Sequence, residues 1–211
     1  SEFPGIELHL IEGNSSELAN DLLHGTIDLM IDLLPFTAEN VDTVPICQEE
    51  ILLVVPDEVL KKAHPDGWDE LRKKMEQGAD VRLLENCPFV LLNKGNRVRT
   101  IADEIFEDAQ VTPHIALETE NIETALALSV KGMGITFYPR MFMSPDHAAN
   151  TNKNPLTHQT GLNLYPLNYS RAHGTLGLGY HKGHYMSRAT HEFIRIALER
   201  IPYVAKDAEC D

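Results

Sequence analysis

The order of apolar and polar positions repeats one unit twice along the chain. Residues 4–31 and 113–139 each read as a β-rich run, an asparagine, an amphipathic stretch, a glycine and a second apolar run. Gly25 lies 11 residues after Asn14, and Gly132 lies 11 residues after Asn121. Asparagine is a favoured helix N-cap, and glycine is favoured just after a helix ends. Each copy therefore predicts a strand, a helix and a second strand, and two such halves predict a cleft that binds a small molecule.

The pattern continues outside the two copies as an alternation of strands and helices. Helical spacing of apolar residues predicts helices after Asn14, over 100–109, after Asn121 and over 188–201. Residues 57–82 are charged and predict a helical surface that is broken at Pro65–Gly67. This alternation predicts an α/β fold whose parallel sheets are covered by helices. The predicted strands cover 6–11, 27–33, 51–55, 89–92, 162–167 and 175–180.

Composition narrows the class of protein. The 211 residues are 43% hydrophobic, which is enough for a packed core in one large or two small domains. The net charge is −14, from 18 Lys+Arg against 32 Asp+Glu, whereas a nucleic-acid reader needs cations against phosphates. The sequence contains no run of about 18 apolar residues, so no membrane-spanning helix is predicted. Cys47, Cys87 and Cys210 form no motif, which favours reduced thiols in the cytoplasm over a peroxide-sensing pair.

Several runs taken in order resemble a known family. EGNSSEL, GTIDLMI, ILLVVP, PFVLL and GMGITFYP are similar to the effector-binding domain of LysR-type transcriptional regulators, over residues 4 to about 201. The resemblance implies two Rossmann-like subdomains joined by two crossover strands, as in type 2 periplasmic binding proteins, with an inducer between them. It implies subdomain I at 1–85 plus 170–211 and subdomain II at 86–169. It also implies that the first strand and helix of subdomain I, and a DNA-binding winged helix-turn-helix, lie before residue 1.

Ligands of open α/β sheets bind where strands end and helices begin, because unpaired N–H groups and the helix dipole attract anions there. Arg97 is the preferred partner for a ligand carboxylate. The alternative is that Arg97 and Arg99 are solvated beside Glu104 or Glu107, and that Asn14 and Asn121 are helix caps alone. Family position adds Ser15 and Leu33 as expected contacts. The expected effector-binding residues are Asn14, Ser15, Ser16, Leu33, Asn96, Arg97, Val98, Arg99, Asn121 and Ile122.

No catalytic motif and no cofactor motif is found in the sequence. His181 and His184 are three residues apart but have no evident third ligand, so we expect surface histidines and no metal site. We therefore expect a non-enzymatic cytoplasmic sensor of a small carboxylate or another anion, with no membrane partner and with DNA contacted only through the missing N-terminal domain. The alternatives are a transporter's solute-binding protein or an enzyme on the same scaffold. The family implies a homodimer or tetramer when intact, with helices 15–24 and 100–109 of two subunits antiparallel.

Overall fold

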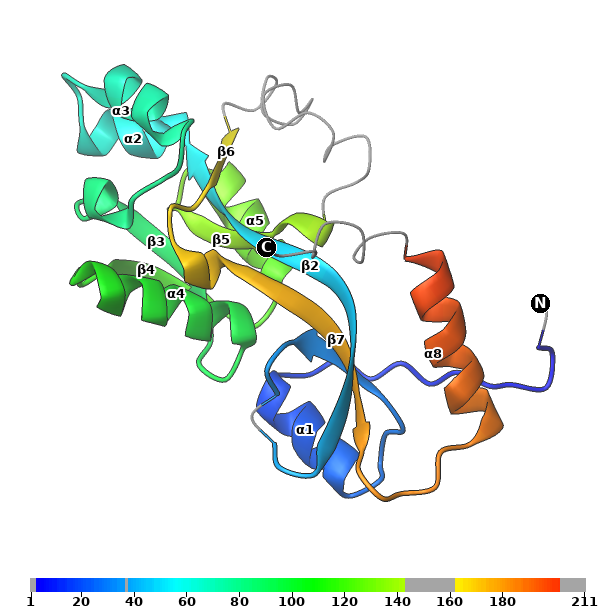
Figure 1. Cartoon of the computed structure of the whole chain (residues 1–211). Coiled ribbons are helices and arrows are strands. Elements are labelled where there is room, and N and C mark those ends of the chain that lie inside the picture. The colour runs from blue at the N-terminus through cyan, green and yellow to red at the C-terminus, as the bar shows by residue number, and fades with distance from the viewer. Residues whose placement is uncertain (1–2, 37, 143–161, 202–211) are drawn as a thin grey trace, which may run out of the picture. The chain divides into compact units, whose positions relative to one another are not determined.

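The computed structural model describes residues 3–36, 38–142 and 162–201 (Figure 1). Contacts divide the chain into two compact units: unit 1 is Ser1–Gln48 with Gly174–Asp211, and unit 2 is Glu49–His173. The expected subdomains, 1–85 with 170–211 and 86–169, stay a prediction. Packing places residues 57–84 in unit 2, because Asp57 accepts a hydrogen bond from Asn163 at 2.6 Å and Asp80 one from Tyr169 at 2.7 Å.

Unit 1 is built on three strands and two helices. Strand β7 (His173–His181) lies between β1 (Met30–Leu33) and the first part of β2 (Val41–Pro56), and it is antiparallel to β1. Helix α1 (Ser15–Leu23) packs Ala19 and Leu22 against Met30. Gly179 in β7 allows the segment after β1 to lie close to β7, since a Cβ at this position would be 2.3 Å from a ring carbon of Phe36. Helix α8 (Arg188–Arg200) completes the unit, capped by the Ser187 hydroxyl.

The predicted strand over 6–11 is wrong for this structure. Residues 6–11 are unpaired and exposed, with Leu8 at 74% and Leu10 at 89% of full exposure. Within the described residues β1 pairs only with β7, so no neighbouring strand offers hydrogen bonds to this segment, and a lone strand is not stable in water. Helix α8 forms as predicted, but its apolar stripe is partly uncovered, with Leu198 at 47% exposure. Unit 1 therefore presents apolar surface at both of these segments.

Unit 2 contains the parallel pairing that the sequence predicts. Strand β3 (Pro88–Leu92) is parallel to β4 (His114–Thr119), and Ile135, just before β5 (Thr136–Pro139), pairs in parallel with Phe89 on the other side of β3. The second part of β2, however, is antiparallel to both β5 and β6 (Leu162–Pro166). Parallel pairing requires a crossover between the paired strands. Strands β2 and β7 lie outside the repeated units, so the prediction of parallel strands fails there.

Two helices cover opposite faces of the unit 2 sheet. On α4 (Arg97–Ala109), Phe106 contacts the rings of Phe89 and Phe137 at centroid distances of 5.0 and 5.6 Å. On α5 (Ile122–Val130), Ile122, Leu126 and Val130 pack with Tyr138. Phe137 and Tyr138 are consecutive in β5 and so point to opposite faces. Both faces of β3 are thereby covered, which explains why Phe89–Leu92 are all buried.

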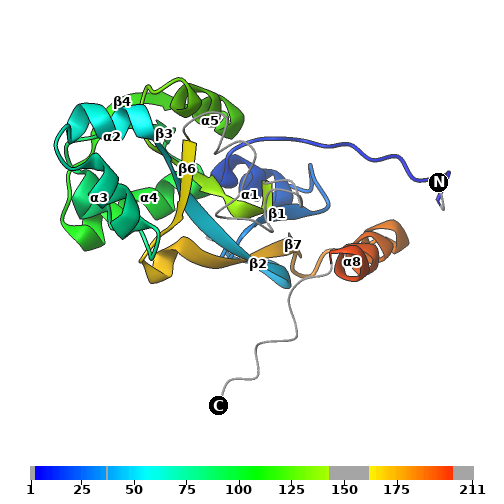
Figure 2. The ribbon, with the colours of Figure 1, turned by 90° about the horizontal axis from the view of Figure 1, so that it is seen from above.

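The charged segment after β2 folds as two short helices, α2 (Asp57–Ala63) and α3 (Trp68–Met75), which are visible side by side in Figures 1 and 2. The predicted break between them is confirmed. The Trp68 ring lies 4.4 Å from Lys61 Nζ and 5.7 Å from the Arg72 guanidinium carbon. Short 3-10 turns follow at η1 (Val81–Leu84), η2 (Arg140–Phe142) and η3 (Ser170–Ala172). No helix among the described residues has the length and apolarity that a membrane span requires.

The repeated unit is complete in its second copy only. There β4, the Asn121 cap, α5, Gly132 and β5 follow in order, whereas the first copy begins at the Asn14 cap and continues through α1 and Gly25 to β1. Gly25 and Gly132 have φ values of 73° and 76°, the left-handed conformation expected after a helix. The α/β class is confirmed. Strands β2 and β7 each have residues in both units, as expected of two crossover strands.

Candidate functional site

The carboxyl edge of the β3–β4 pair brings two helix N-termini together within unit 2. The last residues of the two strands, Leu92 and Thr119, are in register, and the Asn93 N–H donates to the Thr119 carbonyl at 2.8 Å. Helix α4 follows β3 and helix α5 follows β4. Both first turns therefore lie at the edge where α/β sheets bind ligands. We refer to this part of unit 2 as the α4–α5 edge.

The two predicted asparagine caps, Asn14 and Asn121, are confirmed, and Asn96 caps α4 as well. The side-chain oxygen of Asn96 accepts the Val98 N–H at 2.9 Å, and that of Asn121 accepts the Thr124 N–H at 3.0 Å. In unit 1, Asn14 accepts the Glu17 N–H at 2.9 Å. Each cap satisfies one N–H of its helix, and a helix begins with four N–H groups that have no partner within it. The capping asparagines thus leave other donors of the first turn available to a ligand.

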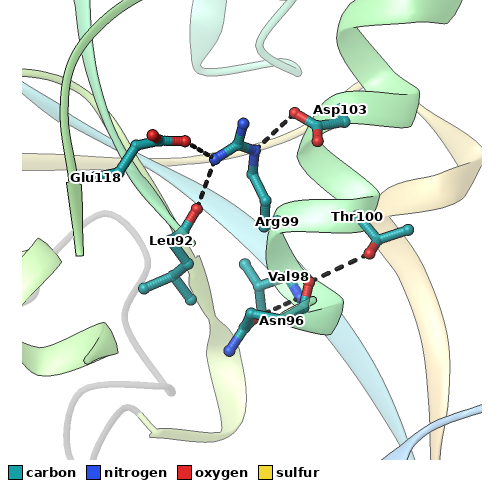
Figure 3. Close-up of polar contacts among 7 residues, drawn as sticks. All are labelled: Leu92, Asn96, Val98, Arg99, Thr100, Asp103 and Glu118. Carbon is teal, nitrogen blue, oxygen red and sulfur yellow. Dashed lines mark hydrogen bonds and ion pairs between the residues drawn. The ribbon is translucent and has the colours of Figure 1, made fainter. Parts of the chain in front are cut away.

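Arg99 is held inside unit 2 by three acceptors (Figure 3). Its side chain is only 4% exposed and donates to the Leu92 carbonyl at 2.7 Å, to Asp103 at 2.8 Å and to Glu118. Burial alone would lower the pKa of the guanidinium, but the two carboxylates outweigh that effect and raise it. Arg99 therefore ties the end of β3 to the first turn of α4. The alternative of a solvated arginine beside Glu104 or Glu107 is wrong for this residue.

Arg97 differs from Arg99 in its exposure and in its partners. It is half-buried, and its Nε atom is buried without a hydrogen-bond partner among the described residues. The carboxylate suggested as its alternative partner, Glu104, lies 3.0 Å from Arg171 instead. Within the part of the chain that the structure describes, no ion pair joins Arg97 to an acid. The guanidinium of Arg97 is thus the cation of this turn that a ligand can use.

The three candidate first turns differ in their own charge. The first turn of α4 contains no acidic residue, whereas α1 begins with Glu17 and α5 with Glu123. Glu123 in addition accepts the Tyr138 hydroxyl at 2.6 Å, so its charge stays beside the α5 terminus. A helix N-terminus stabilises an anion by about 0.3–1 kcal/mol, and a carboxylate of the same turn offsets that effect. The α4 turn is therefore the most favourable of the three for an anion.

The remaining predicted contacts divide between the two units. Val98 is buried at 8% exposure, and Ile122 packs on the Tyr138 cluster, so both side chains serve the core of unit 2. In unit 1, Leu33 is buried at 7% exposure at the end of β1. Ser15 is half-buried and Ser16 exposed in the first turn of α1. Unit 2 thus brings together Asn96, Arg97, Val98, Arg99, Asn121 and Ile122, while Asn14, Ser15, Ser16 and Leu33 belong to unit 1.

Sequence reasoning missed the two carboxylates that hold Arg99. The spacing of Arg99 and Asp103, four residues apart on one helix, is a known signal for an ion pair and was available. Glu118 gives no such signal, because it reaches Arg99 from strand β4, 19 residues away in sequence. The prediction that Arg99 contacts a ligand did not take this partner into account.

Cys87 lacks the environment of a reactive thiol. Cys87 has no exposed surface, and burial raises the pKa of its thiol to about 11. Cys47 is buried as well, and Cys210 lies outside the described residues. A redox-sensing cysteine needs an accessible thiolate with a lowered pKa, so Cys87 is unsuited to peroxide sensing. Among the described residues, no group of three or more His, Cys, Asp or Glu side chains can hold a metal ion.

Comparison with known proteins agrees with this architecture. The chain is 27% identical over 147 residues to an uncharacterized HTH-type transcriptional regulator, YcgK of Bacillus subtilis (strain 168), a match that covers 67% of this chain and 45% of the relative. The chain thus spans less than half of that regulator's length. Its fold is similar to the effector binding domain of QuiR in complex with shikimate, with a TM-score of 0.66, 19% identity, and 89% and 78% of the two chains covered.

A second solved structure has a similar fold over most of its length. It is the Synechocystis PCC6803 CcmR regulatory domain in complex with 2-PG, with a TM-score of 0.70, 16% identity, and 95% and 86% of the two chains covered. The family model described as the LysR substrate binding domain matches residues 1–202. Because this match covers nearly the whole chain, the chain belongs to the LysR substrate-binding domain family.

Proposed function

We propose that the chain is the effector-sensing domain of a LysR-type regulator and that a small anion binds at the α4–α5 edge. The observation that carries this proposal is the first turn of α4, which has no acidic residue and carries the unpaired Arg97. Family membership supports a sensor over a transporter's solute-binding protein, as do relatives named HTH-type transcriptional regulators. The shikimate and 2-PG complexes of two similar folds support a small ligand.

Each residue of the turn has a distinct part in this binding. The ligand carboxylate accepts N–H groups of the first turn that Asn96 does not cap, and it pairs with the guanidinium of Arg97. Arg99 does not touch the ligand; it fixes the first turn through Leu92. An anion at the first turn of α4 faces the guanidinium of Arg97 and the dipole of α4, since the charge of Arg99 is already balanced by two carboxylates.

The step from binding to regulation is part of the same proposal. A ligand shifts a conformational equilibrium only by its difference in affinity for the two states, so an effector must favour one arrangement of the intact regulator. DNA is contacted by a helix-turn-helix segment outside these residues, in a cytoplasmic homodimer or tetramer. Antiparallel contacts between α1 of one subunit and α4 of its partner form the two-fold interface. No turnover of the ligand is expected.

Calorimetric titration with a panel of small carboxylates, including shikimate, tests the ligand assignment. Arg97→Gln removes the charge and is expected to weaken binding at least about tenfold, which corresponds to about 1.4 kcal/mol. Arg188→Gln is the matched control, because Arg188 is likewise the first residue of a helix but belongs to unit 1. Unchanged affinity of Arg97→Gln, or an equal loss in Arg188→Gln, would place the ligand elsewhere.

A further inference from the structure

A tight turn after β7 brings two histidines face to face. The His184 N–H donates to the His181 carbonyl at 3.4 Å, which closes a β-turn over residues 181–184. Gly183, the third residue of this turn, has a φ of 81°, a positive value that favours glycine. The imidazole rings stack with their centroids 3.7 Å apart and their planes at 16°. Nδ1 of His181 donates to the Lys182 carbonyl at 2.8 Å, which holds this ring in place.

The stacked pair lines a cavity of about 150 Å³ that lies wholly within unit 1. The end of β7 contributes Tyr180, the segment before β1 contributes Asp28, and Tyr185 follows the turn. Leu22 and Met186 provide apolar wall. The cavity therefore combines aromatic rings, an apolar wall and one carboxylate, and none of its residues belongs to the α4–α5 edge.

The charges around this cavity favour a cation. No lysine or arginine lines it, and Asp28 is its one carboxylate. Asp28 is exposed, and among the described residues no hydrogen bond or ion pair engages its side chain. The faces of aromatic rings attract cations, by about 0.5–1 kcal/mol at exposed sites and by more when the cation is desolvated. The net charge of −14 adds a favourable long-range field.

We propose that this cavity is a second ligand site, selective for a small organic ammonium ion. Asp28 provides the balancing charge and Tyr180 aromatic wall, and the His181–His184 stack and the 91% exposed Tyr185 also line the cavity. A cavity of about 150 Å³ holds a molecule of the size of benzene, so the ligand has roughly five to seven non-hydrogen atoms. The site is independent of the proposed anion site, and the chain would then respond to two ligands of opposite charge.

Titration with tetramethylammonium, followed by NMR of the histidine ring protons, tests the proposal. The resonances of His181 and His184 are expected to shift and to saturate, whereas tert-butanol, a neutral molecule of similar shape, leaves them unchanged. Asp28→Asn is expected to weaken tetramethylammonium binding about tenfold or more. Asp66→Asn, which removes an exposed carboxylate between α2 and α3, is expected to leave binding unaltered.

Three results would overturn the site. They are the absence of saturable shifts, equal binding of tert-butanol, and full tetramethylammonium affinity in Asp28→Asn. Zn²⁺ titration separates the remaining alternative, in which the two imidazoles hold a metal. Saturable Zn²⁺ binding that requires both histidines and survives Asp28→Asn would replace the ammonium site with a metal site. None of these results depends on whether Arg97 binds an anion.

Discussion

Replacing Arg99 by methionine tests the division of labour between the two arginines of α4. Methionine fills much of the same volume but donates no hydrogen bond, so the Leu92 carbonyl loses its buried partner. An unsatisfied buried acceptor costs about 1–3 kcal/mol. Asp103 and Glu118 are 45% and 47% exposed and can return to water, so each lost ion pair adds about 0.2–1 kcal/mol. We expect Arg99→Met to lower the free energy of unfolding by about 1.4–5 kcal/mol, the sum of these contributions.

Urea denaturation measures this loss through Trp68, the single tryptophan of the chain, which lies in unit 2 with Arg99. A shift of the midpoint with an unchanged slope reports a change of stability alone. Arg97→Met is the matched control two residues away, and we expect it to change the unfolding free energy by less than about 0.5 kcal/mol, because among the described residues no ion pair joins Arg97 to an acid.

The two variants are also expected to differ in ligand binding. Arg97→Met should lose affinity for small acids while staying folded, whereas Arg99→Met should keep that affinity under conditions in which it remains folded. If the free energy of unfolding of Arg99→Met lies within about 0.5 kcal/mol of that of the unsubstituted chain, Arg99 does not have the internal role assigned to it. If Arg97→Met is the less stable variant, Arg97 is the arginine with the internal role.

Three further predictions concern unit 2. Arg82 lowers the pKa of Asp80 from 3.8 to about 2, so Asp80 contributes stability above about pH 4 that is lost as the pH falls towards 2. Solvent screening reduces this contribution to about 1 kcal/mol. Asp80→Asn should remove that part of the pH dependence of urea unfolding. Cys87 should resist iodoacetamide until the chain is denatured, and rapid native labelling would contradict its burial. Gly134→Ala would place a Cβ 2.8 Å from a β3 carbonyl oxygen and should cost about 1–3 kcal/mol, unlike Gly67→Ala, which has open space.

Local signals predicted the elements whose partners are also local. The asparagine caps and the left-handed glycines act within a few residues of their helices, and each is found where the repeated unit placed it. The strand predicted over 6–11 has the same alternating pattern as a real strand. A strand nevertheless exists only through a neighbour, and among the described residues none is paired with it. Pairing between distant segments is the information that its pattern lacks.

The sequence was enough to predict where Asn96 and Asn121 lie, but not what Arg99 does. The order of strands and helices was enough to place Asn96 and Asn121 at one edge, because parallel strands end on the same side. The role of Arg99 depended on Glu118, which is 19 residues away in sequence. The stacking of His181 on His184 was also missed, although the sequence His-Lys-Gly-His is typical of a turn that brings its first and fourth residues together.

Helix geometry explains why two arginines so close in sequence have opposite roles. Each helical residue is rotated by about 100° from the one before, so side chains two apart point in nearly opposite directions. Arg99 shares its side of α4 with Asp103, four residues further on, and on that side Leu92 and Glu118 also accept its hydrogen bonds. Arg97 is rotated away from those acceptors, which leaves it without an ion pair in the described part of the chain. Arg99, the third residue of the helix, is therefore engaged inside unit 2, whereas the guanidinium of Arg97, the first residue, is left for a ligand.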